Sequence, residues 1–303
     1  MKSVQVLLSS YNGEKYIRRQ IDSILNQRDV DIHLLIRDDG SKDQTRKIIL
    51  EYADKYPNQV EVELGENLGW KKSFFRLLQD AGTYDYYAFS DQDDFWYEDK
   101  ECSSVILMEE DTVDCAKLVQ VNCRTTDKNL NPITPQPPKR PVFPAHHDAI
   151  YAEEFFQGCS MTWNKKAMEL LQRYRPMGNY GHDYWVGVVC YLLGKIYFIN
   201  QVKFDYIRYE TSVSTTGQPH RGQWLRLKRF IKGDKDIYYN VGGDLLSGYN
   251  LELSLHDRKV CTFFKNYKNN IYAKMYILLN PYIRRNSFSG TIFFKLNILL
   301  NRI

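Results

Sequence analysis

The sequence predicts an α/β protein whose central, mostly parallel sheet is flanked by helices. Through the first hundred residues, short apolar runs typical of buried strands alternate with segments whose apolar residues recur at helical spacing. Polar loops follow several of these runs. Strict alternation of strand and helix implies parallel strands joined by helices that cover both faces of the sheet, with ligands at the carboxyl ends of the strands.

The elements of this first part follow one another in a regular order. Strands are predicted at residues 4–8, 32–36, 60–64 and 86–89, where the chain is apolar. Helices are predicted at 17–27, from Asp43 through 53, and around 74–78. Asp43 is a suitable N-cap for the second helix because its carboxylate can accept backbone N–H groups.

Three polar loops are predicted to lie on one edge of the sheet. Residues 9–14, with the sequence Ser-Ser-Tyr-Asn-Gly-Glu, follow the first strand, residues 37–41 follow the second, and residues 90–94 follow the fourth. Neither a Gly-x-Gly-x-x-Gly nor a Gly-x-x-x-x-Gly-Lys-Ser/Thr motif occurs, which disfavours a dinucleotide-binding fold and a P-loop. The three loops therefore predict a different kind of ligand site.

The third loop carries the carboxylates Asp91, Asp93 and Asp94. Two interpretations are open for this motif alone. Asp clusters are common in polar turns after strands. Carboxylates at the end of a buried strand are also where an α/β protein can hold a divalent cation against a phosphate.

The middle of the chain has a proline-rich stretch and then a second structured part. Residues 132–144 hold six of the ten prolines, which predicts a surface loop within one catalytic domain or an inert linker. Residues 156–163 are strand-like, 166–173 are helical, and 181–193 form a long apolar helix that opens with Asp183 in its first turn. An Asp in this position is usually a cap, and a catalytic role is the alternative.

The C-terminal region differs from the rest of the chain in charge. Residues 221–303 contain 15 Lys and Arg against 5 Asp and Glu, whereas residues 1–220 contain 26 against 32. A basic region rich in aromatics suits an anionic membrane or nucleic acid surface. Residues 224–232 and 292–303 are candidate amphipathic helices, which could equally pack on the body or on another subunit.

Composition sets the protein class and the compartment. With 43% hydrophobic and 26% charged residues, the chain is typical of a folded globular protein. The six cysteines form no Cys-x-x-Cys pair, which favours reduced, buried thiols over a zinc site. The chain opens directly on a strand-like run and no apolar segment reaches about 20 residues, so we expect a cytoplasmic protein without a membrane span.

These motifs together resemble the family 2 glycosyltransferases, nearest to the bacterial rhamnosyltransferase-like branch that builds surface polysaccharides. The resemblance covers residues 3–215 in order. It rests on residues 9–16, 20–27, 38–41, 67–69 and 90–94, which read SSYNGEKY, QIDSILNQ, DDGS, NLG and SDQDD.

The resemblance implies a GT-A fold and a domain division. Residues 1–220 would form the glycosyltransferase domain, with a nucleotide-sugar half at 1–100 and an acceptor half at 101–220. Residues 221–303 would form a basic, aromatic, helical C-terminal region on the inner face of the cell membrane. The enzyme would move rhamnose from dTDP-rhamnose, or a hexose from a UDP-sugar, onto a growing, lipid-linked glycan, with inversion of the anomeric centre.

The resemblance also implies roles for individual residues. The donor pocket would contain Ser9, Tyr11, Glu14, Asp39 and Asp91, with Asp39 accepting the imide N–H of uracil or thymine. Asp91 and Asp93 would hold Mn²⁺ or Mg²⁺, and Asp183 would be the catalytic base. His182 and Trp185 are candidate acceptor contacts, and the aromatic residues near the motif loops that could stack on sugars are Trp70, Trp96, Tyr184 and Trp185.

The expected chemistry fits these residue types. A nucleoside diphosphate leaves more easily when a cation neutralises its charge, and Asp oxygens are ligands that Mg²⁺ and Mn²⁺ prefer. Inversion needs one carboxylate to accept the proton of the acceptor hydroxyl. Many relatives have a His where this chain has Tyr209, a poor metal ligand at pH 7, so Glu210 or His220 could substitute.

Two alternatives remain open. A sugar-nucleotide pyrophosphorylase would normally have a Gly-rich loop with Arg and Lys after the first strand, and this chain has Ser-Ser-Tyr-Asn-Gly-Glu instead. An inactive paralogue or binding module of a glycan-assembly complex is the other. A homo-oligomer is compatible with either function. No basic stripe interleaved with aromatics lies in residues 1–220, so nucleic acid is not an expected partner.

Overall fold

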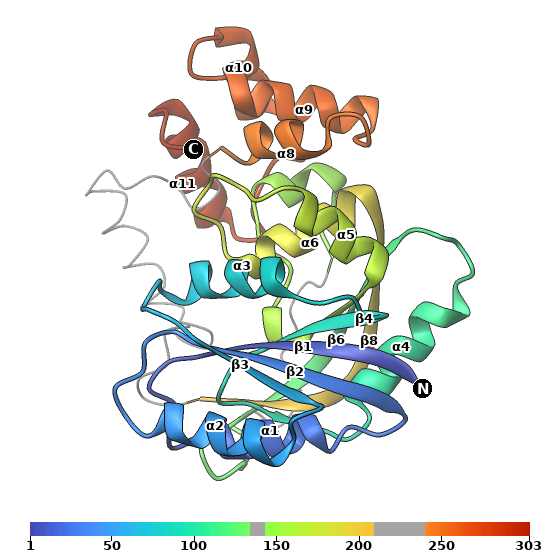
Figure 1. Cartoon of the computed structure of the whole chain (residues 1–303). Helices are drawn as coiled ribbons and strands as arrows, with labels where there is room; N and C mark the ends of the chain where they lie inside the picture. Colours follow the sequence, from blue (N-terminus) through green and yellow to red (C-terminus); the bar gives the residue numbers. More distant parts are fainter. Residues whose placement is uncertain (134–142, 209–239) are drawn as a thin grey trace. The chain divides into compact units, whose positions relative to one another are not determined.

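The computed structural model describes residues 1–133, 143–208 and 240–303 (Figure 1). These residues form two compact units. Unit 1 comprises 1–133, 156–174 and 181–208, and unit 2 comprises 143–155, 175–180 and 240–303. The predicted division at residue 220 therefore differs from the structure at two places, because residues 143–155 and 175–180 belong with the C-terminal helices rather than with the sheet.

Unit 1 is built on an eight-stranded sheet with the order β3-β2-β1-β4-β7-β6-β8-β5. Its first half is parallel and consists of β1 (Lys2–Ser10), β2 (Val30–Asp38), β3 (Val60–Leu64) and β4 (Tyr86–Ser90). All four strands were predicted. Their continuous apolar runs reflect burial on both faces of the sheet, since the strands lie between two layers of helices.

The second half of the sheet is mixed. The short strand β7 (Met161–Asn164) is antiparallel to both β4 and β6 (Ala116–Thr126). Next come β8 (Gly194–Ile207), parallel to β6, and β5 (Phe95–Trp96), antiparallel to β8. Neither β6 nor β8 was predicted. In β6, buried polar residues such as Gln120 and Asn122 interrupt the apolar pattern.

Helices cover both faces of this sheet. Figure 1 shows α1 (Ile17–Leu25) and α2 (Thr45–Lys55) on one face, and α3 (Trp70–Asp80), α5 (Lys165–Arg173) and α6 (His182–Leu193) on the other. The helical spacing of apolar residues explains the packing of α1, whose Ile17, Ile21 and Ile24 are fully buried. A further helix, α4 (Lys100–Glu110), was not predicted and packs on β6.

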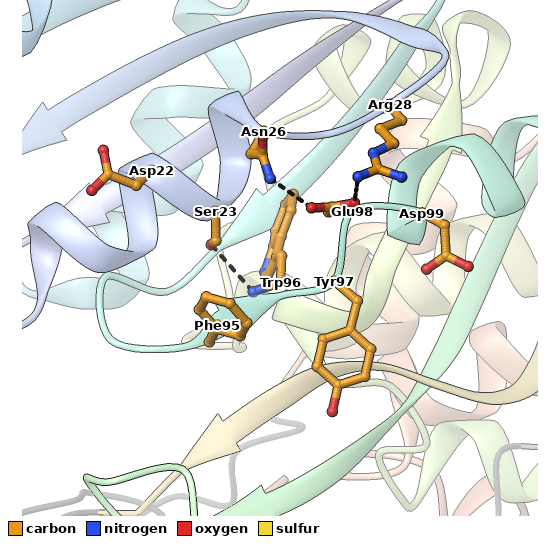
Figure 2. A pocket seen from close by; sticks show the side chains of 9 residues that line it. All are labelled: Asp22, Ser23, Asn26, Arg28, Phe95, Trp96, Tyr97, Glu98 and Asp99. Atoms are coloured by element: carbon orange, nitrogen blue, oxygen red, sulfur yellow. Dashed lines mark hydrogen bonds and ion pairs between the residues drawn. The ribbon is translucent and has the colours of Figure 1, made fainter.

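A buried ion pair connects α4 to the sheet. Lys100 Nζ lies 2.5 Å from Glu101 Oε1, and the other Glu101 oxygen accepts the Thr162 hydroxyl at 2.9 Å. The Lys100 ammonium also lies 3.6 Å from the centre of the Trp96 ring. The backbone N–H of Trp96 in turn donates to Ser23 Oγ of α1 at 3.2 Å (Figure 2). This chain of contacts fixes β5 between α1 and α4.

Unit 2 is helical. It contains the 3₁₀ turn η1 (His147–Tyr151) and four helices: α8 (Val241–Tyr249), α9 (Leu255–Asn266), α10 (Ile271–Leu279) and α11 (Phe288–Leu299). Ser254, Asn270 and Ser287 cap three of these helices with side-chain hydrogen bonds. The predicted helix at 292–303 corresponds to part of α11, whereas residues 224–232 lie outside the described part of the chain. Among the described residues, no helix is long and apolar enough to span a bilayer.

Two His–Asp pairs join η1 to α9 within unit 2. His147 Nε2 lies 2.6 Å from Asp257 Oδ1, and His256 Nε2 lies 2.6 Å from Asp148 Oδ1. Asp257 also accepts the Tyr151 hydroxyl at 2.8 Å. The hydrogen bond to Asp257 raises the pKa of His147 above its usual 6.5, so the folded protein favours the charged imidazole.

We expect the His147–Asp257 pair to make unit 2 more stable below neutral pH than above it. A raised pKa in the folded state gives a stabilisation that is complete below about pH 6.5 and is lost as pH rises through the raised value. Because His147 is about half exposed, solvent limits the effect to about 1 kcal/mol.

A double-mutant cycle measures the coupling energy between His147 and Asp257. It compares urea unfolding of the wild type, His147→Gln, Asp257→Asn and the double variant. The coupling energy from this cycle should at least halve between about pH 6 and about pH 8.5. Equal coupling at both pH values would contradict a charged imidazole in the pair.

Candidate active site

The carboxyl ends of three parallel strands bring the predicted loops together. In the sheet register, Ser10 of β1 pairs with Asp38 of β2, and Leu8 of β1 pairs with Ser90 of β4. Residues 9–14, 38–41 and 90–94 therefore start from one edge of the sheet, as predicted. This edge carries the donor and metal residues proposed from the sequence.

Gln92 joins the first loop to the third. Its Oε1 accepts the N–H of Tyr11 at 2.9 Å, and its Nε2 donates to the carbonyl of Tyr11 at 3.1 Å. A Cβ atom at Gly13 would lie 2.2 Å from Gln92 Oε1, so a larger residue at this position would displace the Gln92 amide. Gln92 thus positions the loop that carries the carboxylates, and Tyr11 keeps an exposed ring.

The first loop is also held against the start of α2. Asn12 Oδ1 accepts the N–H of Lys42, and Glu14 Oε2 accepts the N–H of Gln44, both at 2.9 Å. Asp43, the predicted helix cap, accepts the N–H groups of Thr45 and Glu14 at 3.0 and 3.1 Å. In this structure the Glu14 carboxylate therefore stabilises the first turn of α2, and its predicted donor contact stays a prediction.

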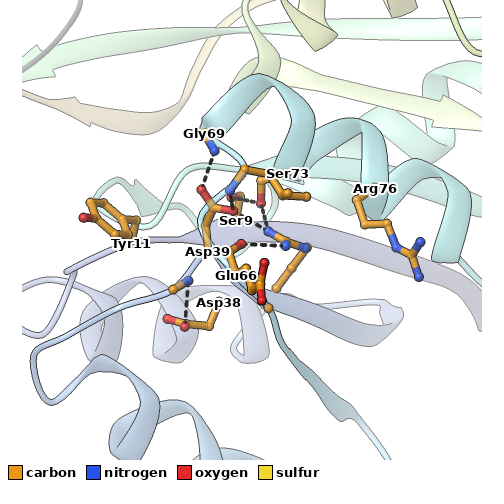
Figure 3. A network of polar contacts seen from close by, with 12 residues as sticks. Ser9, Tyr11, Asp38, Asp39, Glu66, Gly69, Ser73 and Arg76 are labelled. Carbon is orange, nitrogen blue, oxygen red and sulfur yellow. Dashed lines mark hydrogen bonds and ion pairs between the residues drawn. The ribbon is translucent and has the colours of Figure 1, made fainter.

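Asp39 lies at the centre of a buried polar network (Figure 3). Arg37 Nη1 donates to Asp39 Oδ1 at 2.6 Å, and both side chains are almost completely buried. The N–H groups of Leu68 and Gly69 donate to the two Asp39 oxygens at 2.8 and 2.9 Å. Three donors therefore already occupy the carboxylate that was predicted to bind a uracil or thymine base.

The same network reaches the first strand through Ser73 of α3. Arg37 Nη1 donates to Ser73 Oγ at 3.0 Å, and Ser73 Oγ lies 2.6 Å from Ser9 Oγ (Figure 3). Ser9, a predicted donor residue, is thereby tied to the Arg37–Asp39 pair. The end of β1, the end of β2 and the start of α3 are consequently held as one assembly.

Gly69 places Trp70 at the start of α3. Gly69 has φ +80°, a conformation that favours glycine, and it directly precedes the helix. The Trp70 side chain is 48% exposed, and its ring lies edge-on to His182 with a centroid distance of 5.7 Å. A Cβ atom at Gly181 would contact Trp70 at 3.7 Å and Asp183 Oδ1 at 2.2 Å. Trp70 thus presents an exposed ring beside Asp183.

His182 and Trp185 are core residues in this structure, which disagrees with the predicted acceptor contact. His182 is 4% exposed and stacks on Phe74 with a centroid distance of 3.8 Å. Burial lowers the pKa of His182 to about 4, so the imidazole is neutral at pH 7. Trp185 is 1% exposed. Both side chains lie on the side of α6 that packs into unit 1, whereas Asp183 in the same turn is only partly buried.

Asp183 lies in the first turn of α6, where the helix dipole favours a carboxylate. Its Oδ1 accepts the N–H of Tyr184 at 2.9 Å, and the residue is only partly buried. The charge of Asp183 also contributes to the raised pKa of Asp91, after burial and the charge of Asp93. The structure therefore brings the predicted base close to the predicted metal motif.

The third polar loop, residues 90–94, is the motif loop, and it contains a cluster of desolvated carboxylates. Burial and neighbouring charges raise the pKa of Asp91 to about 7, and burial raises that of Asp93 to about 6. Burial and the charges of Asp91 and Asp93 raise the pKa of Asp94 well above its usual value. Such carboxylates repel one another, and a divalent cation among them would relieve the repulsion.

The structure groups Asp91 of the predicted ligand pair with Asp94 and Cys159, and the role of Asp93 as a ligand stays a prediction. Single ligand atoms of Asp91, Asp94 and Cys159 all lie within 4.8 Å of one another. Both Asp94 oxygens are buried without a hydrogen-bond partner among the described residues. This acceptor set fits Mg²⁺ or Mn²⁺, which prefer carboxylate oxygens. Nothing in the sequence pointed to Cys159, and burial raises the pKa of its thiol, which leaves it neutral.

Tyr209, Glu210 and His220, the residues considered for completing the metal shell, lie outside the described part of the chain. The other aromatic candidates for sugar stacking, Trp96 and Tyr184, are buried. Of the four aromatic residues proposed from the sequence, Trp70 is the one with an exposed ring.

Comparison with known proteins identifies the protein family of this chain. Residues 5–171 match the model of glycosyl transferase family 2. The dTDP-rhamnosyl transferase RfbG of Shigella flexneri is 38% identical over 124 residues, which cover 40% of this chain and 40% of RfbG. The chain thus matches less than half the length of that relative.

Solved structures share the fold at low sequence identity. The TarS 1–349 fragment from S. aureus, crystallised with UDP-GlcNAc, superimposes with a TM-score of 0.55 at 15% identity and covers 100% of this chain and 92% of that one. The mannosyltransferase PcManGT from Pyrobaculum calidifontis, in complex with GDP-Man and Mn²⁺, gives a TM-score of 0.51 at 16% identity, with coverage of 99% and 86%. The fold is that of the GT-A glycosyltransferases, and the family match over more than half of the sequence shows that this chain belongs to glycosyl transferase family 2.

Proposed function

We propose that the protein is an inverting, metal-dependent glycosyltransferase in which Asp183 is the catalytic base. The observation that carries this proposal is the proximity of Asp183, at the start of α6, to the carboxylate cluster that contains Asp91. Trp70 adds an exposed aromatic ring beside Asp183. Base, cation ligands and a surface for stacking on a sugar thus belong to one site.

In this mechanism Asp183 accepts a proton from the acceptor hydroxyl. The acceptor oxygen forms a bond to the anomeric carbon while the bond from that carbon to the diphosphate oxygen breaks, and the configuration inverts. Asp91 and Asp93 would hold Mn²⁺ or Mg²⁺, aided by Asp94, and the bound cation would neutralise the departing diphosphate. Trp70 orients the sugar by stacking on its C–H face.

Donor recognition would use the loops after β1 and β2. Ser9 and Tyr11 lie at the end of β1, and Asp39 retains acceptor capacity beyond its three donors, because a carboxylate has about four lone-pair sites. The name of the relative RfbG supports dTDP-rhamnose as the donor, and the UDP-GlcNAc complex of TarS supports a UDP-sugar as the second choice. The Mn²⁺ in the PcManGT complex supports manganese.

We also propose a growing, lipid-linked surface glycan as the acceptor, met at the inner face of the cell membrane. Residues 221–303 carry 15 Lys and Arg against 5 Asp and Glu. In unit 2, Ile271, Tyr272 and Phe288 expose large apolar side chains. Basic and apolar side chains together favour binding to an anionic lipid surface.

The Asp183→Asn variant should still bind the sugar-nucleotide donor but should lose most of its turnover. The amide keeps the shape of the side chain but cannot accept the acceptor proton, so kcat should fall by about 10² to 10⁴. Release of dTDP or UDP from the sugar nucleotide measures turnover, and calorimetry with dTDP and UDP in Mn²⁺ measures binding. The exposed Asp54→Asn is the matched control. Full activity of Asp183→Asn would remove this residue from the mechanism.

Mn²⁺ affinity should fall as pH decreases from about 8 to about 5.5. Protons compete with the cation for Asp91 and Asp93, whose pKa values are raised to about 7 and about 6, so the loss should be about tenfold or more. Electron paramagnetic resonance of free Mn²⁺ measures this binding. Asp91→Asn should weaken it at every pH, whereas Asp54→Asn should reproduce the wild-type profile. A pH-independent affinity would argue against these ligands.

Asp39→Asn should destabilise unit 1 by about 3 to 5 kcal/mol, because it removes the buried counter-charge of Arg37 and leaves only the more distant, partly exposed Glu63 at 3.7 Å. The control Arg76→Gln removes a half-exposed ion pair on α3 and should cost less than about 1 kcal/mol. Urea unfolding distinguishes the two.

Nucleotide preference then tests the second role of Asp39. The uracil imide is a donor and the corresponding cytosine nitrogen is an acceptor, so folded Asp39→Asn should lose affinity for UDP and gain relative affinity for CDP. An unchanged ratio of UDP to CDP affinity would restrict Asp39 to a structural role.

A further inference from the structure

Unit 1 contains a cavity of about 800 Å³ between the end of α1 and the segment that begins with β5 (Figure 2). Its volume lies in the range typical of small-molecule sites. It is lined by Asp22, Ser23, Asn26, Arg28, Phe95, Trp96, Tyr97, Glu98 and Asp99. None of these belongs to the proposed donor, metal or base residues. The cavity is on the side of α1, whereas Asp183 comes from α6 on the opposite face of the sheet.

The charged walls of this cavity are held in place by neighbouring residues. Glu98 accepts the amide of Asn26 at 3.0 Å and forms an ion pair with Arg28, and the N–H of Arg28 donates to the carbonyl of Glu98 at 2.9 Å. Asp99 pairs with Lys203 at 2.6 Å. Such fixed walls reduce the entropy that binding would cost.

The remaining polar groups are also positioned. Asp22 Oδ1 accepts the hydroxyl of Tyr52 at 2.6 Å, and the hydroxyl of Tyr97 donates to Asp205 at 3.1 Å. The rings of Phe95 and Tyr97 are partly exposed, and their centroids lie 6.4 Å apart. The cavity therefore combines two aromatic rings with oriented carboxylates and an amide.

This combination matches a saccharide. Sugar rings present C–H faces that pack on aromatic rings, and their hydroxyl groups donate to carboxylates such as that of Asp22. Of its three carboxylates, Glu98 pairs with Arg28 and Asp99 pairs with Lys203, which leaves one negative charge, that of Asp22. A negative lining disfavours phosphates and acidic sugars and favours neutral sugars or amino sugars.

We propose that this cavity is a second glycan-binding site, which holds a neutral or amino sugar of the acceptor or product chain away from the site of transfer. The choice of ligand class rests on the proposed function. A chain held at the second site would reach the transfer site at a higher effective concentration, so long acceptors would have a lower KM than short ones.

Fluorine NMR of the full chain labelled with 5-fluorotryptophan tests the proposal, because Trp96 lines the cavity and Trp70 lies beside Asp183. Trp96→Phe and Trp70→Phe assign the two resonances. Without a nucleotide sugar, a rhamnose trisaccharide or triglucosamine should shift the Trp96 resonance in a saturable manner. A galacturonic acid trimer and inorganic phosphate should not.

Two variants and their controls locate the binding. Phe95→Ala and Asp22→Asn should each weaken saccharide binding by about tenfold or more, while the exposed Leu50→Ala and Asp54→Asn should leave it unchanged. Asp22→Asn keeps the shape of its side chain and so remains informative if Phe95→Ala fails to fold. Equal affinity in a folded variant and its control would overturn the proposal.

The other outcomes separate this inference from the proposed function. The second site is overturned if neither saccharide shifts the Trp96 resonance, or if only the Trp70 resonance shifts. It is also overturned if an uncharged tripeptide binds more tightly than both saccharides. In a parallel experiment, dTDP- and UDP-sugars are added with Mn²⁺. If these donors give neither turnover nor a shift of the Trp70 resonance while saccharides still shift the Trp96 resonance, the cavity is supported and the transferase assignment is refuted.

Discussion

The buried Arg37–Asp39 ion pair is the contact on which the geometry of the site depends. A guanidinium and a carboxylate removed from water are stable only while each has its partner and its hydrogen bonds. Asp39 meets this condition with the N–H groups of Leu68 and Gly69, and Arg37 meets it through Ser73. The pair thereby fixes the connection from β3 to α3. Because that connection ends at Trp70, the ion pair also determines where the exposed ring stands.

The motif loop shows the opposite electrostatic arrangement. Its carboxylates lie close together, Asp94 is fully buried, and the two Asp94 oxygens have no hydrogen-bond partner among the described residues. A folded protein retains such repulsion where a ligand can relieve it, which is typical of functional sites. The well-paired charges around Asp39 supply the rigid frame, and the cluster around Asp91 supplies the attraction for a cation. Gln92 connects the cluster to the loop after β1 and fixes its position.

The first half of the sheet and the position of the three polar loops could be predicted from the sequence, and the second half of the sheet could not. Strands β1 to β4 are continuous apolar runs, so their period and their polar ends were visible along the chain. In contrast, β6 buries Gln120 and Asn122, which read as solvent-exposed positions in a single sequence. His182 and Trp185 were expected at an acceptor and lie in the core, since local sequence does not reveal which face of α6 packs inward.

The parallel half of the fold, the three polar loops and their carboxylates can be recognised in the amino-acid sequence, because they depend on local periodicity and on residue chemistry. Features that depend on residues far apart in the chain become visible in the folded protein. The tertiary structure brought Cys159 to Asp91 and Asp94, committed Asp39 to three donors, and exposed Trp70 while burying Trp185. It also formed the cavity between α1 and β5, whose walls come from segments about 70 residues apart. Burial and charge pairing set these roles, and both are properties of packing rather than of local sequence.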